Sequence, residues 1–317
     1  MRYLLTALGT NHNSSICTYL KNFENNYLVG TDIYPAKYIP ASIGINAFYQ
    51  TKSIYEMDTY AEQLFEICKK EKIDILIPII DEEVLYLSEN IKNFNSIGVK
   101  ILVSNAAVVK FCRNKMQTQD FLKKYFPQLY IKTEFLCSLT QNTFPLFIKP
   151  NNGRASTNCI KINNEKELMF YKEYFDKKDF IVQEYIDGDF YTADFFYDTK
   201  NDYFITLIRQ ELVRNKNGCG IVIKIVKNEY LEKILKSLIS KIGYNGIGNC
   251  EFICKNDKFF LVEINPRFSA GIDYSIKAGV NFLQIAIDTL MGNKPDILSI
   301  NPKCDTIFVR KYETYEM

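Results

Sequence analysis

Short apolar runs alternate with longer amphipathic segments over the first third of the chain. Four runs predict strands, at residues 3–9, 27–31, 73–80 and 99–104. Segments with helical periodicity lie between them, beginning near Ser14 or Ser15 and at residues 58–71 and 82–92. Strands that alternate with helices at this spacing predict a doubly wound parallel sheet, which we place in residues 1–108.

A different pattern begins at about residue 110. It predicts a helix at residues 110–125, followed by a second helix near 165–175 that is flanked by short strands at 133–137, 146–149 and 181–185. We therefore expect residues 109–187 to comprise a linker helix and a small α+β lid.

Longer strands with alternating apolar and polar positions follow Gly188. Helices are predicted at residues 228–242 and 274–291, with a hairpin between them whose strands lie near 249–254 and 260–265. No repeat or low-complexity segment interrupts the sequence, so residues 188–317 should form a third unit that packs closely on the others.

The hairpin carries the most informative polar residues of the chain. Its predicted three-residue loop, 256–258, sets Glu251 directly across from Glu263. Like charges that face each other across a strand pair are destabilising, so a bound cation is the expected compensation. Glu263 and Asn265 share one face of the strand, which ends just before Arg267. Two oxygen ligands for a hard cation, with an arginine beyond them, predict a site for a magnesium polyphosphate.

A lysine ends an earlier apolar strand. Residues 144–148 lead into Lys149, and a small-residue loop with the single glycine Gly153 follows. A lysine in this position can hold phosphate oxygens, with loop N–H groups as further donors. A lysine that extends from a strand end into solvent is an equal alternative for this segment alone.

The strand at 181–185 breaks at Gly188, and Asp189 follows. Backbone N–H and C=O groups of such a segment can bind the edge of adenine, and a carboxylate beyond it can bind ribose hydroxyls. By itself, however, a strand followed by Gly-Asp is also an ordinary turn.

In their order along the chain, these residues resemble the ATP-grasp superfamily, particularly its branch similar to the large subunit of carbamoyl-phosphate synthase. The resemblance covers nearly the whole chain, and residues 1–105 are similar to the family's pre-ATP-grasp domain. Its most specific element is Glu263 to Arg267 with Glu251 upstream. It implies an α/β protein in which an ATP-grasp fold follows the doubly wound parallel-sheet domain.

The resemblance also implies roles for individual residues. In the nucleotide site it implies phosphate contacts for Lys115 and Lys149, an adenine amino contact for Gln183, backbone contacts to adenine for Glu184 and Ile186, and a ribose contact for Asp189. It implies that Glu251, Glu263 and Asn265 hold magnesium and that Arg267 contacts the transferred phosphoryl group. The loop after Lys149 has fewer glycines than is common in the family, so we expect its clamp on the β-phosphate to be looser or to be ordered by Ser156.

The residues around the acceptor are less specific. Arg209 and Glu211 share a strand face, and the resemblance places their segment near the acceptor and the γ-phosphate, with Arg209 catalytic and Arg214 binding an anionic substrate. An exposed strand with cross-strand ion pairs is an equal alternative for Arg214. Gly271 belongs to a small-residue stretch that can form the floor of an acceptor pocket. His12 lies at the carboxyl end of the first strand, where open α/β sheets bind ligands, although a capping or solvent role is more common.

Composition argues against several classes of function. Lys and Arg number 39 against 37 Asp and Glu, a formal charge of +2, and the basic residues are scattered, so no nucleic-acid partner is expected. Nine cysteines, an odd number without a C-x-x-C pair, predict reduced core thiols in a cytoplasmic protein without zinc. No apolar run reaches membrane-spanning length. Because His12 is the only histidine, mechanisms that need a Ser-His pair or several His ligands are nearly excluded.

The resulting prediction is an ATP- and magnesium-dependent ligase, with two ions expected and Mn²⁺ as a substitute. A carboxylate would attack the γ-phosphate to give an acylphosphate and ADP, and an amine or another nucleophile would then displace phosphate. The expected partners are a small-molecule carboxylate and an amine, and a homodimer is left open. Amino acids, sugar acids and peptide carboxylates all stay open as acceptors.

Three alternatives are weighed against this prediction. The first is a carbamate or carboxylate kinase-like partial reaction of the carbamoyl-phosphate synthase type, although the chain lacks room for that enzyme's duplicated halves. The second is a non-catalytic ATP-binding regulator, against which the intact Glu251, Glu263 and Arg267 argue. The third is a dinucleotide-dependent oxidoreductase, which ranks last because residues 9–14 do not form G-x-G-x-x-G.

Overall fold

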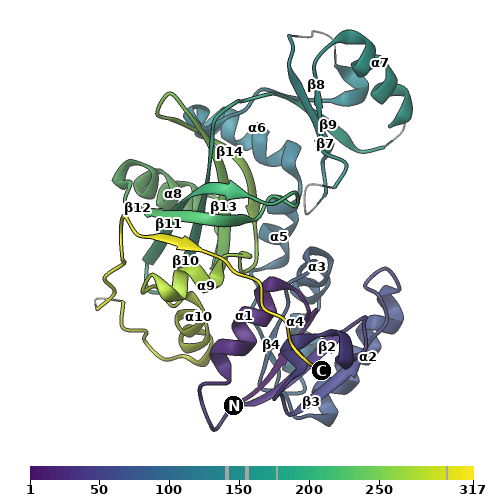
Figure 1. Cartoon of the computed structure of the whole chain (residues 1–317), viewed down its shortest axis with the longest axis vertical. Coiled ribbons are helices and arrows are strands. Elements are labelled where there is room, and N and C mark those ends of the chain that lie inside the picture. The colour runs from purple at the N-terminus through teal and green to yellow at the C-terminus, as the bar shows by residue number, and fades with distance from the viewer. Residues whose placement is uncertain (140–142, 154–156, 176–177, 298) are drawn as a thin grey trace.

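The structure, a computed structural model, describes residues 1–139, 143–153, 157–175, 178–297 and 299–317. The strands among these residues form three sheets, each accompanied by helices (Figure 1). The N-terminal unit lies at one end of the molecule, a six-stranded sheet lies in the middle, and a small four-stranded sheet stands out at the other end (Figure 1).

The N-terminal sheet is parallel throughout, in the order β3-β2-β1-β4-β5. Its strands are β1 (Arg2–Leu5), β2 (Tyr27–Asp32), β3 (Ala47–Gln50), β4 (Ile75–Ile77) and β5 (Lys100–Ile101), and its helices are α1 (Asn11–Leu20), α2 (Met57–Lys70), α3 (Asp81–Glu89) and α4 (Ile91–Asn95). α1 packs on one face, whereas α2 and α3 pack on the other. The carboxyl ends of β1 and β4 therefore form the point where the sheet reverses its winding, and the predicted doubly wound sheet is confirmed.

Several predicted boundaries in this unit are wrong. β3 was not predicted, because this short edge strand is only half-buried and lacks a clear apolar run. α1 begins at Asn11 and not near Ser14, because the side chain of Thr10 accepts a hydrogen bond from the N–H of Asn13 at 3.4 Å and caps the helix. The runs 73–80 and 99–104 form strands only at their centres.

The predicted helix 110–125 is two helices, α5 (Ala106–Arg113) and α6 (Lys115–Tyr125). Asn114 separates them, because its side chain accepts the N–H of Gln117 at 2.9 Å and starts a new helix. Both helices pack into the core of the six-stranded sheet and not into the lid. The boundaries at residues 108 and 187 stay a prediction.

The lid has the predicted α+β composition. Its antiparallel strands run in the order β6-β9-β7-β8 and comprise β6 (Thr133–Phe135), β7 (Leu146–Pro150), β8 (Ile160–Ile162) and β9 (Phe180–Glu184). α7 (Glu165–Tyr174) covers one face, and Leu168 of this helix packs with Ile148 and Val182 in a core that belongs to the lid alone.

The central antiparallel sheet has the order β14-β13-β10-β11-β12-β15. Its strands are β10 (Asp189–Asp198), β11 (Tyr203–Arg214), β12 (Gly220–Val226), β13 (Gly246–Lys255), β14 (Lys258–Asn265) and β15 (Ile307–Val309), and its helices are α8 (Glu229–Lys241), α9 (Ile272–Lys277) and α10 (Phe282–Met291). The last two replace one predicted helix at 274–291. Gly279 separates them with φ of 98°, which favours glycine, and Asn281 caps α10.

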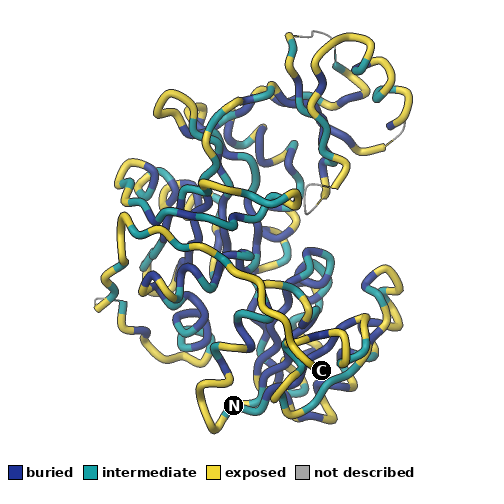
Figure 2. The backbone as a smooth tube through the Cα atoms, in the orientation of Figure 1, coloured by how far each residue is buried: buried dark blue, intermediate teal, exposed yellow. Residues whose placement is uncertain are grey.

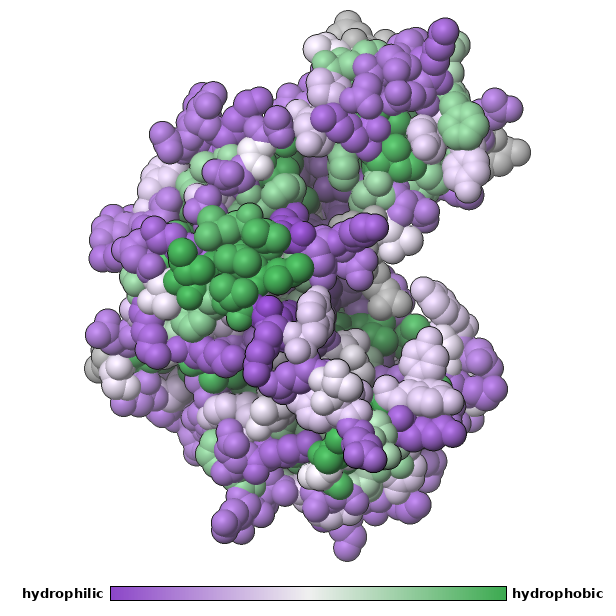
Figure 3. All heavy atoms as spheres, in the orientation of Figure 1, coloured by the Kyte–Doolittle hydropathy of each residue, from purple (hydrophilic) through white to green (hydrophobic). Residues whose placement is uncertain are grey.

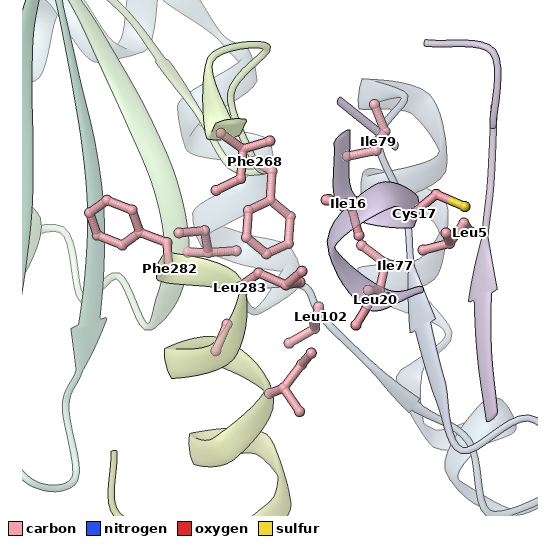
Figure 4. Packing of buried hydrophobic residues seen from close by; sticks show 14 of the residues in the cluster. Leu5, Ile16, Cys17, Leu20, Ile77, Ile79, Leu102, Phe268, Phe282 and Leu283 are labelled. Carbon is pink, nitrogen blue, oxygen red and sulfur yellow. The ribbon is translucent and has the colours of Figure 1, made fainter. Parts of the chain in front are cut away.

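One apolar core joins the N-terminal unit to the central unit (Figure 4). Ile16 and Leu20 of α1 and Ile77 of β4 face Phe268 and Leu283 from the region of α9 and α10 (Figure 4). Buried backbone follows most strands of the three sheets, whereas β15 and the outer turns are largely exposed (Figure 2). The N-terminal and central units thus share a core that the lid does not enter.

All nine cysteines lie in the described part of the chain and are free thiols. Cys17, Cys68, Cys112 and Cys250 are buried, as expected of core thiols. The expectation of core positions is wrong for Cys137 and Cys304, which are exposed.

A buried carboxylate holds the loop between β4 and α3. Glu83 accepts hydrogen bonds from the hydroxyls of Thr6, at 2.7 Å, and Tyr60, and from the backbone N–H groups of Ile79 and Ile80, at 3.4 and 3.2 Å. This loop lies at the carboxyl edge of the sheet and leads into α3, so Glu83 fixes the chain that enters the candidate site.

Replacing this carboxylate should destabilise the fold. We expect Glu83→Leu to lower the free energy of unfolding by about 2–4 kcal/mol, because two backbone donors and two hydroxyls lose their buried acceptor. Glu89→Leu, on the same helix but in an exposed ion pair with Lys110, should change it by less than about 0.5 kcal/mol. Urea unfolding of both variants measures the difference, and equal losses would contradict this role for Glu83.

Candidate active site

The hairpin of β13 and β14 places two carboxylates opposite each other. Glu251 pairs with Glu263 in the strand register, as predicted. The predicted three-residue loop is wrong: the turn consists of Asn256 and Asp257, both with positive φ. A register shift between Glu251 and Phe252 adds the missing residue and restores the pairing.

Two lysines lie on one side of this carboxylate pair. Lys115, at the start of α6, lies with Nζ 3.4 Å from a carboxylate oxygen of Glu263 and donates to Gly153 O at 3.0 Å. Lys149, near the end of β7, is buried and donates to Val262 O at 3.3 Å. Burial, together with the charge of Lys115, lowers the pKa of Lys149 to about 8. Burial alone would raise the pKa of Glu263, but the two lysines outweigh it and lower this pKa.

Arg214 lies on the other side of the pair. Its guanidinium approaches Glu251 at 3.2 Å and Glu211 at 2.7 Å, and it lies 4.0 Å above the centre of the Phe190 ring. Burial and the neighbouring charge of Glu263 raise the pKa of Glu251 to about 7. Arg214 is thus partly buried and forms ion pairs within the central sheet, and it also lines the candidate site; its contact with an anionic substrate stays a prediction.

The oxygen-rich edge of the hairpin continues to Asn265. This residue pairs with Asn249 across the strands, and its amide nitrogen donates to Asn249 at 3.1 Å and to Glu263 at 3.3 Å. No group of three or more His, Cys, Asp or Glu side chains in the described chain is arranged to hold a metal. Two facing carboxylates with adjacent amides instead fit a hard cation that draws its other ligands from a polyphosphate and water.

Arg267 connects the hairpin to the switch point of the N-terminal sheet. Its Nε donates to Asp81 at 2.6 Å, and its Nη1 lies 3.3 Å from His12 Nε2. Burial, reinforced by the charge of Arg267, lowers the pKa of His12 to about 3, so the imidazole is neutral. Nε2 can then accept from Arg267 while Nδ1 carries the proton. His12 was expected at this edge, and it lies there.

Arg209 is tied into the protein more tightly than expected. It is buried, forms an ion pair with Asp194 at 2.7 Å and donates to Ser269 at 3.3 Å. Gly271 makes room for it, because a Cβ at this position would lie 2.8 Å from the guanidinium. The structure thus gives Arg209 and Gly271 a packing role at the floor of the site.

Two adjoining cavities meet at the carboxylates. The first, of about 380 Å³, lies between the lid and the central sheet, and the second, of about 340 Å³, lies between the central sheet and the N-terminal unit. Arg214, Gly218, Glu251 and Glu263 line both cavities. In the space-filling view the molecule is indented between the lid and the N-terminal unit (Figure 3).

The candidate residues divide between these cavities. The first is lined by Lys115, Lys149, Gln183, Glu184 and Ile186, and the second by His12, Arg209, Asn265, Arg267 and Gly271. Asp189, the first residue of β10, is exposed and lines neither cavity, so a ribose contact from it stays a prediction. Ser156 lies outside the described residues.

Sequence reasoning missed three contributors to the site. Asp81 follows β4 at the switch point, and the rule that placed His12 there after β1 could also have found it. Asn249 could have been found as the partner of Asn265 once the hairpin register was set. Phe147 gave no signal beyond its apolar strand, because only the sheet register shows that it faces the first cavity.

The antiparallel central sheet and the small lid sheet lie on either side of a cavity that Lys115, Lys149 and Arg214 line. Residues 176–313 match the family model described as "ATP-grasp in the biosynthetic pathway with Ter operon". Residues 3–102 match the model described as "PylC-like, N-terminal domain". The two matches confirm the predicted resemblance to the ATP-grasp superfamily.

Curated relatives point to the same branch. The carbamoyl phosphate synthase large chain of Clostridium botulinum (strain Kyoto / Type A2) is 24% identical over 253 residues, which cover 74% of this chain and 23% of the relative. The large chain of Thermoanaerobacter sp. (strain X514) is 24% identical over 261 residues, with the same coverage of 74% and 23%. The chain spans about a quarter of the length of these relatives.

Solved structures share the fold. The biotin carboxylase of Campylobacter jejuni, in a β-γ-ATP complex, aligns with a TM-score of 0.75 at 14% identity over 95% of this chain and 73% of that chain. The L-amino acid ligase of Bacillus licheniformis aligns with a TM-score of 0.70 at 15% identity over 95% and 77%. Both support the predicted ATP-grasp fold after a parallel-sheet domain. Separately, no helix among the described residues has the length and apolarity needed to span a membrane.

The lowered pKa of Lys149 predicts how the free energy of unfolding depends on pH. In the folded protein it is about 8, below the ordinary 10.5 of an unfolded chain, so stability should rise with pH between these values. At pH 7 the buried charge is a cost, and Lys149→Met should stabilise the nucleotide-free protein by about 2 kcal/mol. The advantage of the variant should shrink as pH rises from 8 to 10.5.

Urea unfolding at pH 7, 8, 9 and 10 measures this difference. Lys161→Met, which removes an exposed lysine from the neighbouring strand, is the matched control and should leave the pH profile parallel to that of the wild type. If the pH profile of Lys149→Met is also parallel to that of the wild type, or if the variant is less stable at pH 7, the buried charge of Lys149 does not destabilise the folded protein.

Proposed function

We propose that the chain is an ATP- and Mg²⁺-dependent ligase that activates a carboxylate as an acylphosphate for attack by an amine or another nucleophile. The observation that supports this most directly is the position of Glu251 and Glu263 at the junction of the two cavities. The first cavity has an apolar end suited to a base. The second cavity joins it where the facing carboxylates and their cationic neighbours lie.

The first cavity suits a nucleotide along its length. Phe147 and Ile186 supply apolar surface at the end near β9, and Gln183 supplies a polar group there. Lys115 and Lys149 lie between this end and the carboxylates. We assign them to phosphate oxygens, which would also stabilise the charge on a buried Lys149.

Glu251, Glu263 and Asn265 would hold magnesium. When bound, the ion neutralises the polyphosphate and polarises the terminal phosphate. The Campylobacter jejuni biotin carboxylase, which has a similar fold, was solved as a β-γ-ATP complex, which is consistent with a nucleotide in the first cavity.

The second cavity suits the acceptor. Arg267 extends into it from the hairpin, and Asp81 and His12 hold the guanidinium in place. A fixed arginine beside the carboxylate pair can stabilise charge on the transferred phosphoryl group, as can Arg214 from the other side. The acceptor carboxylate would attack the terminal phosphate, and the walls of the cavity would limit access of water to the acylphosphate.

The geometry favours cleavage at the γ-phosphate. A nucleotide with its base at the β9 end directs its terminal phosphate toward the carboxylates, where the acceptor cavity begins. We therefore expect turnover to release ADP and inorganic phosphate, with one oxygen of an ¹⁸O-labelled substrate carboxylate in that phosphate. A panel of amino acids, sugar acids and peptides, with hydroxylamine to trap the acylphosphate as a hydroxamate, identifies the substrate for this measurement. Release of AMP and pyrophosphate, or phosphate that carries only solvent oxygen, would refute the mechanism.

Magnesium dependence tests the carboxylate pair. Glu263→Gln keeps the shape of the side chain but removes its charge, so it should raise the Mg²⁺ concentration needed for nucleotide binding by about tenfold or more without unfolding the protein. Glu229→Gln, at an exposed position on α8, should leave this concentration unchanged. Calorimetric titration with ATP at several Mg²⁺ concentrations measures both. If Glu263→Gln keeps the wild-type dependence, Glu263 is not a metal ligand.

A further inference from the structure

A row of side chains crosses the lid sheet on the face that lines the first cavity. Thr133 of β6 pairs with Gln183 of β9, Gln183 pairs with Phe147 of β7, and Phe147 pairs with Lys161 of β8. Side chains directly opposite each other on neighbouring strands project from the same face. Because Gln183 and Phe147 line the cavity, Thr133 lies on that face as well, beside Gln183.

Thr133 determines which end of the Gln183 amide it faces. Its hydroxyl oxygen lies 2.7 Å from Ile131 O, and because a carbonyl oxygen only accepts, the hydroxyl must donate its proton there. The same oxygen lies 2.8 Å from the Gln183 amide. With its proton already used, it can only accept a second hydrogen bond. The amide nitrogen of Gln183 therefore faces Thr133, and its oxygen Oε1 faces away.

Oε1 of Gln183 opens on the cavity. No described residue donates a hydrogen bond to this oxygen. Since it is also absent from the described polar atoms that are both unpaired and closed to solvent, it is accessible from outside the protein. Gln183 as a whole is only 4% exposed, so the site offers a bound ligand one fixed acceptor at the apolar end of the cavity.

We propose that Thr133 is the positioning residue that sets the base specificity of the site. A 6-aminopurine can donate to Oε1 of Gln183. A 6-oxopurine would place one acceptor against another, and the amide could turn its nitrogen toward the base only by giving up Thr133. The relay from Ile131 O through Thr133 to Gln183 thus selects a 6-amino over a 6-oxo base. This inference rests on the proposed function, because it takes the first cavity to hold the base of a nucleotide.

The test compares three triphosphates on the wild-type protein and two variants. Affinities for ATP, for ITP, which carries a 6-oxo group, and for purine riboside triphosphate, which carries neither group, are measured by calorimetry with Mg²⁺. The wild type should bind ATP most tightly and ITP most weakly. Thr133→Val keeps the shape but removes the relay, so the amide is free to turn, and the ratio of ATP to ITP affinity should fall by about tenfold. Thr133→Ser keeps the hydroxyl and should keep the ratio.

The outcomes distinguish a failure of this inference from a failure of the proposed function. An unchanged ratio in Thr133→Val, or equal wild-type affinities for ATP and ITP, overturns the relay. If Thr133→Val does not fold, Gln183→Met replaces it, and there the three affinities should become nearly equal. A wild-type protein that binds none of the three nucleotides refutes the proposed function and the relay together. Selective ATP binding without ADP formation on any carboxylate refutes only the proposed reaction.

Discussion

Two carboxylates that face each other across β13 and β14 set the electrostatic requirements of the whole site. Glu251 and Glu263 cannot both be ionised in a partly buried position unless positive charge surrounds them. Three structural elements supply it, since Lys115 comes from α6, Lys149 from β7 and Arg214 from β11. The cleft is therefore organised around a cluster of opposite charges into which a magnesium polyphosphate would fit. The two lysines lie on one side of the carboxylate pair, and Arg214 lies on the other.

The cations in turn need their own partners, and this links the units of the molecule. Arg267 reaches Asp81, which lies 186 positions earlier in the chain and begins α3 of the N-terminal unit. Arg209 is balanced by Asp194 and Glu211 deep in the central sheet. These two arginines are thus held in place by neighbouring carboxylates. Preorganised charge of this kind needs no rearrangement when a substrate's charge develops.

Local patterns predicted the elements and the register of the hairpin, but only because two features compensate. The turn has one residue fewer than predicted, and the unpredicted bulge beside Glu251 adds one residue. Glu251 therefore still pairs with Glu263. Breaks within helices were missed, because Asn114 and Gly279 are single residues inside otherwise periodic segments. Contacts between distant elements, such as Arg267 with Asp81, depend on how the sheets pack, and no local pattern contains that information. The resemblance supplied the candidate phosphate and metal residues, whereas placing Phe147 at the first cavity required the register of the lid.

The apolar core shared by α1 and the region of α9 and α10 makes the structural support of the two cavities different (Figure 4). The walls of the second cavity come from units that this core locks together, so its shape does not depend on the lid. The first cavity has one wall on the lid, whose core is separate. Under the proposed function, substitutions at Asn217, Cys219 and Ala270, which line the second cavity and not the first, could therefore exchange one acceptor for another without altering the nucleotide cavity. A new substrate would then require changes at the wall of the second cavity, whereas the lid and its separate core would stay unchanged.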